Sequence, residues 1–275
     1  MSREHRQQIA QETLEIVQKG FYIAPSGKQV NIAGTQKRSE RVSFVISPDE
    51  GKLLVKDLEG DTGSYNVSYE VKNESTVKTI IENALKSIKI AALNFASAKN
   101  PGGGFINGAI AQEEALCYAS GLYNTQINHM TYYDSNRDCR SAMYTDYAIY
   151  SPDVVFFRNA EYNLLEEPVT CSILTLPAVN MGQIKEKRED IVQAKQVMKD
   201  RMRLALSILA KEGNDIIILG AYGCGVFGNN PNTIAQYWKE LLINEGYGKH
   251  FKHIIFAVLD KTHGDNIRAF EKVFG

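Results

Sequence analysis

The sequence predicts an α/β fold, a sandwich in which helices cover a central β-sheet. In the second half of the chain, short apolar runs typical of buried strands alternate with amphipathic helical segments. The run at residues 215–220 is apolar between its two ends, which is typical of a strand covered on both faces. A length of 275 residues suits one domain of this class with an extension.

The first half of the chain predicts shorter and less regular elements. Residues 3–18 have the pattern of an amphipathic helix, which Gly20 would end. Short strands are expected at residues 21–24, 29–32, 43–46 and 52–55. Further elements are expected in the order strand, helix, strand at residues 65–71, 76–85 and 88–95.

The second half continues with longer elements. Strands are expected at residues 148–150 and 154–157, parted by a turn at 151–153, and at residues 171–176, 215–220 and 253–259. Helices are expected within residues 184–209, at 231–244 and at 265–274. The polar, tyrosine-rich segment 128–147 is predicted to be a loop, either a mobile one that faces substrate or simply a solvated one.

The charge balance excludes a protein that attracts nucleic acid through a general basic field. Lysine and arginine number 31 against 32 acidic residues, for a net charge of -1. We therefore expect no specific nucleic-acid binding, although an anionic polymer gripped locally remains compatible with this balance. No apolar run approaches the roughly 20 residues that a membrane span needs, so no membrane association is expected.

Cysteine usage predicts a reducing compartment. The four cysteines are widely spaced and form no C-x-x-C pair: Cys117, Cys139, Cys171 and Cys224. This spacing argues against a zinc site and against a disulfide framework. Residues 1–18 are polar and lack the apolar core of a signal peptide. We expect a cytoplasmic protein without a metal ion.

A glycine run followed by an acid pair is the most informative motif. Gly102, Gly103 and Gly104 follow the buried strand expected at 88–95 and let the backbone approach a ligand closely. Gln112, Glu113 and Glu114 follow on the expected first turn of a helix. Two glutamates there also interact favourably with a helix dipole without any chemical role. Their position next to three glycines favours chemistry on a nucleotide sugar.

A second glycine cluster at residues 220–228 leaves the buried strand at 215–220. Asn230 and Pro231 then open a helix, as an N-cap residue and a first-turn proline. Backbone N–H groups in such a loop can hold a phosphate without lysine or arginine. The cluster alone is ambiguous, because glycine-rich turns are often only turns. Both clusters follow the carboxyl ends of strands, where ligands of α/β sheets bind.

Together these residues resemble the signature of poly(ADP-ribose) glycohydrolases of the bacterial type. The resemblance rests on three consecutive glycines, a seven-residue spacer and Gln-Glu-Glu, within residues 94–117. Residues 220–230 likewise resemble the diphosphate-binding loop of macrodomains, the fold of that family. The resemblance implies a three-layer α/β/α sandwich with a mixed central sheet. It covers residues 76–275 as the catalytic domain and, more loosely, residues 1–75 as an N-terminal extension packed on the core.

The resemblance also implies the roles of individual residues. We expect no cofactor, and no metal ion because no His/Asp cluster stands near the motif. Glu114 would be the catalytic acid, Glu113 would hold ribose hydroxyls and Gln112 would fix the acid pair. The implied substrate-binding residues are Asn94, Gly102, Gly103, Gly104, Asn107, Gln112, Gly223, Cys224, Gly225, Val226 and Phe227. By the residues alone, Asn94 is equally well a turn residue and Phe227 a core residue.

The implied reaction is hydrolysis of the ribose–ribose O-glycosidic bond of poly(ADP-ribose), which releases ADP-ribose. Adjacent residues lie about 100° apart on a helix, so the two acids cannot flank one bond as in ordinary glycosidases. One acid/base with one positioning residue fits better, and nearby carboxylates raise each other's proton affinity. Two alternatives stay open: a non-catalytic ADP-ribose-binding module, and a hydrolase that removes mono-ADP-ribose from ADP-ribosylated proteins or another acceptor.

Overall fold

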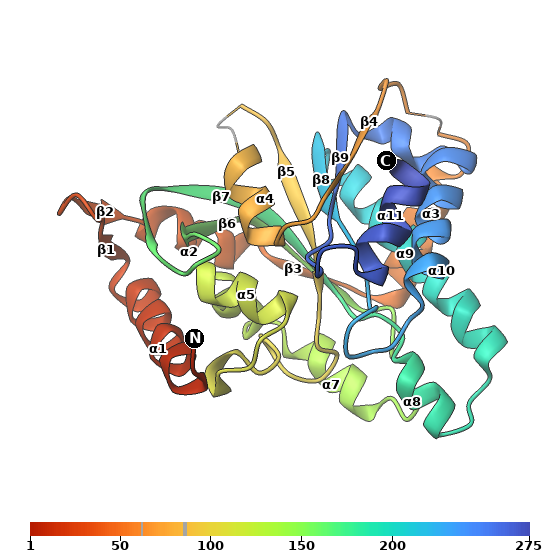
Figure 1. Ribbon diagram of the computed structural model, residues 1–275, viewed down its shortest axis with the longest axis horizontal. Coiled ribbons are helices and arrows are strands. Elements are labelled where there is room, and N and C mark those ends of the chain that lie inside the picture. The colour runs from red at the N-terminus through yellow and green to blue at the C-terminus, as the bar shows by residue number, and fades with distance from the viewer. Residues whose placement is uncertain (62, 85–86) are drawn as a thin grey trace.

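The computed structural model, which describes residues 1–61, 63–84 and 87–275, is built on a seven-stranded mixed sheet (Figure 1). The strand order is β3-β6-β7-β5-β8-β9-β4. These strands are β3 (Phe44–Ile46), β4 (Ser68–Lys72), β5 (Ile90–Phe95), β6 (Ala148–Arg158), β7 (Leu164–Leu176), β8 (Ile216–Leu219) and β9 (His253–Ala257). The pairs β3–β6 and β6–β7 are antiparallel, whereas β7, β5, β8, β9 and β4 run parallel.

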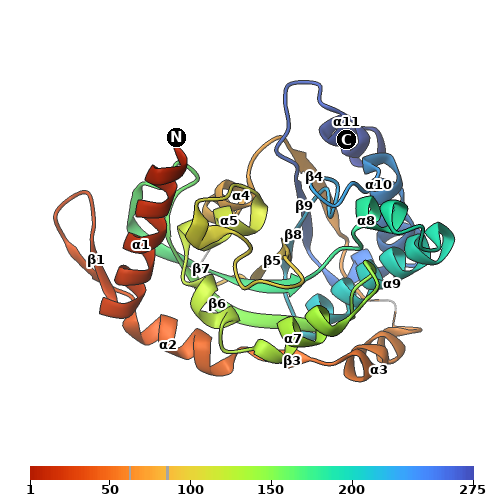
Figure 2. The ribbon, with the colours of Figure 1, turned by 90° about the horizontal axis from the view of Figure 1, so that it is seen from below.

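Helices cover both faces of the sheet, so the molecule has the three layers that the sequence predicted (Figure 2). One face carries α1 (Arg3–Lys19), α4 (Thr76–Asn83) and α5 (Gln112–Ala119), and the other carries α3 (Pro48–Leu58), α9 (Ile191–Lys211), α10 (Pro231–Lys239) and α11 (Asp265–Phe274). Alternate residues of β5 enter the two cores: Ile90 and Ala92 pack on the α1–α4–α5 side, Ala91 and Leu93 on the other. A mixed three-layer sandwich is thereby confirmed.

The remaining elements are short. They are the hairpin β1 (Phe21–Ile23) and β2 (Gln29–Asn31), the helices α2 (Ala33–Val42), α6 (Leu122–Gln126), α7 (Met130–Asp138) and α8 (Met181–Glu186), the 3-10 turns Phe105–Asn107 and Tyr247–His250, and the π-helical turn Glu240–Asn244. No helix in the described part of the chain is both long and apolar enough to cross a membrane.

Residues 1–75 do more than extend the sheet domain. The helix α1, the hairpin β1–β2 and α2 lie outside the central sheet, but β3 and β4 form its two edges. Each edge strand pairs with a strand from the second half of the chain, β3 with β6 and β4 with β9. The division at residue 75 stays a prediction, and the central sheet contains strands from before and after that residue.

Two strand predictions were wrong for identifiable reasons. Residues 52–55, expected as a strand, belong to α3, because Ser47 and Glu50 form a capping box and Pro48 occupies the first helical turn. Residues 148–150 and 154–157 are one strand, β6, instead of two. A bulge with Asp153 at φ 51° absorbs the Ser-Pro-Asp sequence without ending the pairing with β7.

The segment at 128–147 is not the solvated loop that its composition indicated. It contains α7, and Tyr132 and Tyr133 on that helix are fully buried. Arg201 of α9, itself 1% exposed, donates to the carbonyls of Met143 and Pro177 at 2.6 and 3.1 Å. A buried guanidinium therefore holds this segment against the core.

Candidate functional site

Both glycine loops and the acid pair line one cavity of about 1240 Å³. The cavity opens at the carboxyl ends of β5, β8 and β9, which are neighbours in the sheet. Its walls come from the last residue of β5 and the two that follow it (95–97), from Gly103 and Gly104, from Glu113 and Glu114 on α5, and from 225–227 after β8. Parallel pairing of β5 with β8 is what brings the two loops together.

The first glycine loop lies directly against Glu114. Gly102 and Gly103 have φ values of 62° and 58°, a conformation that favours glycine. A Cβ added to Gly103 would stand 2.5 Å from Oε1 of Glu114. The Gly104 N–H donates to the same oxygen at 2.8 Å. The missing side chain at Gly103 thus leaves room for the carboxyl, and the following amide fixes one of its oxygens.

Glu113 is more deeply buried, at 3% exposure, and it is surrounded by hydrogen-bond donors. Its Oε1 accepts from the side-chain amides of Asn94 and Gln126, each at 3.0 Å, and its Oε2 accepts from the Ser97 N–H at 2.7 Å. Burial raises the pKa of Glu113 to about 7, the three donors oppose that rise, and the Glu114 charge adds to it. Glu113 is thus a buried carboxyl with an elevated pKa.

Gln112 fastens α5 to the end of β5. Its Oε1 accepts from the Phe95 N–H at 2.9 Å, and its Nε2 donates to the Leu93 carbonyl at 2.9 Å and to Thr76 Oγ1 at 3.2 Å. One carboxamide thus joins strand β5, helix α4 and helix α5. This geometry supports the predicted role of Gln112 in fixing the acid pair.

Of three further residues expected to bind substrate, Asn107 lines the cavity, whereas Asn94 and Gly102 do not. Asn94 is fully buried, and its amide donates to Glu113 and to Thr175, so it supports the acid from within the protein. Gly102 is also buried. Asn107 lies on the cavity wall, where its carbonyl accepts from Arg3 of α1 at 2.8 Å. The contact of Asn94 is that of a residue that positions Glu113, and direct substrate contact by Asn94 and Gly102 stays a prediction.

The side chain of Asn229 anchors the second glycine loop through hydrogen bonds. The Asn229 Nδ2 donates to the carbonyls of Gly223 and Val179, and a Cβ on Gly223 would meet that amide at 2.6 Å. Of the predicted contacts, Gly223, Gly225, Val226 and Phe227 line the cavity, and Val226 is 89% exposed. Cys224 instead turns its Sγ toward the Tyr222 carbonyl, and burial raises the pKa of this thiol to about 12.

Phe227 combines both interpretations that the sequence allowed. It lines the cavity and also packs against the core on the α9–α10 side. Its ring stands 6.0 Å from that of Tyr144, and its carbonyl accepts from the Gly182 N–H. Tyr144 comes from the segment that Arg201 holds in place. A ring fixed in this way can serve as one wall for a ligand.

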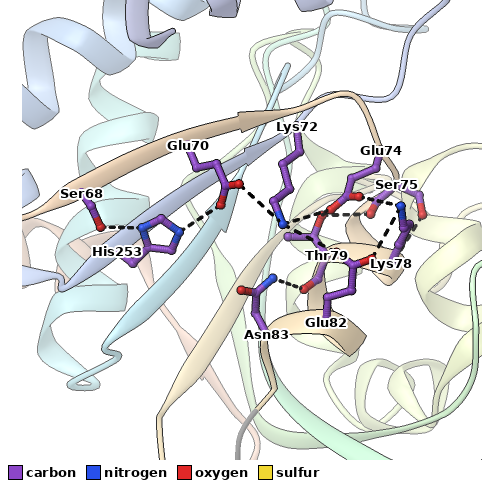
Figure 3. Close-up of polar contacts among 10 residues, drawn as sticks. All are labelled: Ser68, Glu70, Lys72, Glu74, Ser75, Lys78, Thr79, Glu82, Asn83 and His253. Atoms are coloured by element: carbon purple, nitrogen blue, oxygen red, sulfur yellow. Dashed lines mark hydrogen bonds and ion pairs between the residues drawn. The ribbon is translucent and has the colours of Figure 1, made fainter.

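The start of α4, at residues 74–77, forms a part of the cavity that no motif indicated. Figure 3 shows the ion pairs behind it, in which Lys72 Nζ lies 3.7, 3.8 and 3.6 Å from carboxylate oxygens of Glu70, Glu74 and Glu82. Glu74 also accepts from Thr79 Oγ1 at 2.8 Å. These contacts join a strand to a helix, so spacing along the sequence does not reveal them.

The described residues hold no group of three or more His, Cys, Asp or Glu side chains arranged to bind a metal ion. The cavity contains the Glu114 carboxyl, which packs against the first glycine loop, and the buried Glu113 carboxyl, whose pKa is elevated. It also contains the second glycine loop, which precedes the start of α10. Such a set can transfer a proton and hold a polar, phosphate-containing ligand without a metal.

Comparison with known proteins assigns the chain to a family. The family model for the microbial-type PARG catalytic domain, PARG being poly(ADP-ribose) glycohydrolase, matches residues 10–159. The chain therefore belongs to the microbial-type PARG family. The matched residues extend on both sides of residue 75. No curated protein matches the chain.

Solved structures agree along nearly the whole chain. The enzyme from Thermomonospora curvata is 36% identical and superposes with a TM-score of 0.92 over 98% of this chain and 100% of its own. The same enzyme bound to the inhibitor ADP-HPD gives a TM-score of 0.89 at 36% identity, over 98% and 99%. The Deinococcus radiodurans enzyme in complex with ADP-ribose is 39% identical, with a TM-score of 0.81 over 88% and 98%.

Proposed function

We propose that this protein hydrolyses the ribose–ribose O-glycosidic bond of poly(ADP-ribose) and releases ADP-ribose. Membership of the family and likeness to glycohydrolases solved with ADP-ribose and with an inhibitor support this activity. The observation that carries it for this chain is the placement of Glu114 against Gly103, inside a cavity that the second glycine loop also lines.

The ligand would lie along the cavity in three parts. The terminal ribose would rest over Gly103 and Gly104, within reach of both acids. The diphosphate would meet the backbone of residues 223–227 beside the start of α10, where N–H groups and the helix dipole favour an anion. The remaining end is lined by residues 74–77 and by Val258 and Leu259. Its apolar side chains suit the flat face of a base, so we assign it to the adenosine.

The chemistry follows from the unequal surroundings of the two carboxyls. Glu113 is locked by three donors and in its ionised form accepts hydrogen bonds from the ribose hydroxyls. Glu114 gives its proton to the departing 2′-oxygen as the bond to the anomeric carbon breaks through an oxocarbenium-like transition state. Water then attacks that carbon and returns a proton to Glu114.

A cytoplasmic site of action is part of the proposal. All four cysteines are free thiols in the structure. Free cysteines in these positions are compatible with a reducing compartment, where thiols are not oxidised to disulfides.

The test is release of free ADP-ribose from poly(ADP-ribosyl)ated protein, measured by chromatography beside the same assay on mono-ADP-ribosylated protein. We expect release from the polymer. Release from the mono-ADP-ribosylated protein alone would replace the proposal with a hydrolase for another acceptor. No release from either substrate, with ADP-ribose still bound in calorimetry, would identify a binding module.

A further inference from the structure

Gln126, on α6, joins the first glycine loop to the acid pair. Its side chain is fully buried. Its Oε1 accepts from the Gly102 N–H at 2.9 Å, and its Nε2 donates to Glu113 Oε1 at 3.0 Å and to Thr175 Oγ1 at 3.4 Å. A single carboxamide thus connects the loop after β5, the helix α5 and the strand β7.

The orientation of this carboxamide is fixed by its neighbours. If the amide were reversed, its NH₂ would face the Gly102 N–H and its oxygen would face the Glu113 carboxylate, and both contacts would be repulsive. Gly102 also fits closely against α6, because a Cβ there would stand 2.9 Å from Cδ2 of Tyr123. The loop is therefore attached to α6 by packing and by one hydrogen bond.

The segment 97–104, which contains the glycine loop, is hydrogen-bonded to the acid pair at both of its ends. The Ser97 N–H at its beginning donates to Glu113, and the Gly104 N–H at its end donates to Glu114. Between them, the Gly102 N–H reaches Glu113 only through Gln126. Loss of that side chain would leave a buried N–H without its acceptor and would remove one donor from Glu113.

We infer that Gln126 is a positioning residue, which sets the distance between the glycine loop and Glu113 through its hydrogen bonds to the Gly102 N–H and to the Glu113 carboxyl. The consequence for turnover rests on the proposed function, whereas the effect on Glu113 itself does not. Loss of the Nε2–H donor raises the pKa of Glu113 above its value of about 7, because that donor opposes the effect of burial.

The experiment compares Gln126→Leu with Gln36→Leu. Gln36, on α2, is also buried, and its amide donates to the Gly121 carbonyl at 3.0 Å and to Glu40 at 2.8 Å. It therefore controls for the removal of a buried carboxamide. The Glu113 carboxyl is titrated by carbon-13 NMR in ligand-free protein, with its signal assigned through Glu113→Gln. The kcat for ADP-ribose release is measured over the same pH range.

For Gln126→Leu we expect the Glu113 midpoint to rise by about one pH unit and kcat to fall about a hundredfold. The acidic limb of the kcat profile should shift to higher pH together with the Glu113 midpoint. In Gln36→Leu neither quantity should change. Equal loss of thermal stability in both variants would show that the difference in kcat does not come from unfolding.

Gln126→Glu provides a second variant that conserves volume and keeps an acceptor for the Gly102 N–H. It places a second carboxyl against Glu113, so we expect the Glu113 midpoint to rise further than in Gln126→Leu, because neighbouring carboxyls disfavour each other's ionised forms. A Glu113 midpoint equal to that of the wild type would show that residue 126 does not contact the Glu113 carboxyl and would overturn the inference.

The role of Gln126 at Glu113 and the proposed glycohydrolase activity are tested by different results. If the Glu113 midpoint moves but the wild type releases no ADP-ribose, the proposed function is wrong and the role of Gln126 at Glu113 stands. A Glu113 midpoint in Gln126→Leu equal to that of the wild type and of Gln36→Leu overturns the inference, whatever the rate of turnover.

Discussion

Glu113 and Glu114 are neighbours in the chain, but the fold gives them different surroundings. Glu113 accepts two side-chain amides and one backbone N–H, and all of these donors come from buried or partly buried groups. Glu114 meets the backbone of the glycine loop and borders the cavity. The sequence predicted a division into one proton-transfer residue and one positioning residue, and these contacts supply a physical basis for it.

The pKa of Glu113 predicts how stability depends on pH. Burial raises it from 4.5 to about 7, so the folded state binds this proton more tightly than the unfolded chain does. The stabilisation is therefore complete below pH 4.5 and is lost as the pH rises to about 7. Since the amide of Glu113→Gln does not titrate, the unfolding free energy of the variant relative to wild type should rise by about 3 kcal/mol between these limits.

Urea unfolding of both proteins at pH 4.5 and pH 8 measures this difference. The comparison is internal to each protein, so any hydrogen bond that the glutamine fails to make cancels from it. A constant difference between variant and wild type at the two pH values would show that Glu113 is not a buried carboxyl with an elevated pKa.

Gly103→Ala tests the close approach of the loop to Glu114. The new Cβ would stand 2.5 Å from Glu114 Oε1, so the carboxyl must move. We expect the rate of ADP-ribose release to fall about a hundredfold, with weaker ADP-ribose binding in calorimetry. Gly27→Ala is the matched control, because Gly27 also has a positive φ, 85°, and has nothing within 4 Å of the new Cβ. Equal rates and affinities in the two variants would contradict the placement of the loop.

At the scale of single elements, local signals decided how well the sequence could be interpreted. The start of α10 was predictable because Asn230 caps it and Pro231 follows, and α11 matches the predicted residues 265–274. The strand predicted at 52–55 failed because its apolar run of three residues, 53–55, also fits one turn of a helix. Burial of Tyr132 and Tyr133 was hidden by the polar residues around them.

Gln126 shows why part of the site could not be predicted. It belongs to no motif, and its partners Gly102, Glu113 and Thr175 come from three other segments of the chain. Only the pairing of β5 with β7 brings Thr175 beside Asn94. The glycine and acid motifs are local and could be recognised, whereas the buried amides that support them depend on tertiary structure.

The contact between α9 and the 141–147 segment gives a prediction about stability. Arg201→Met would remove the donor from the carbonyls of Met143 and Pro177 and break the ion pair with Asp146. We expect the free energy of unfolding in urea to fall by about 2–3 kcal/mol, because two carbonyls lose a charged donor. Arg203→Met, on the same helix in more exposed ion pairs, should cost about 1 kcal/mol or less. Similar losses in both variants would show that Arg201 is not a special anchor.

At the scale of the whole molecule, sheet topology assembles the site. The two glycine loops are more than one hundred residues apart in the chain, yet they follow the adjacent parallel strands β5 and β8. The edge strands β3 and β4 both come from the first 75 residues, and α1 contacts the loop beside the acids through Arg3 and Arg6. The N-terminal residues are therefore part of the structure that shapes the cavity.

The central claim is that Glu114 carries the proton for glycosidic cleavage in a site that binds ADP-ribose. The most direct measurement pairs release of ADP-ribose from poly(ADP-ribosyl)ated protein with ADP-ribose calorimetry, for wild type and Glu114→Gln. We expect the variant to lose release by a factor of about 10²–10⁴ while its affinity for ADP-ribose stays close to that of the wild type. Release by Glu114→Gln at the wild-type rate would contradict the account.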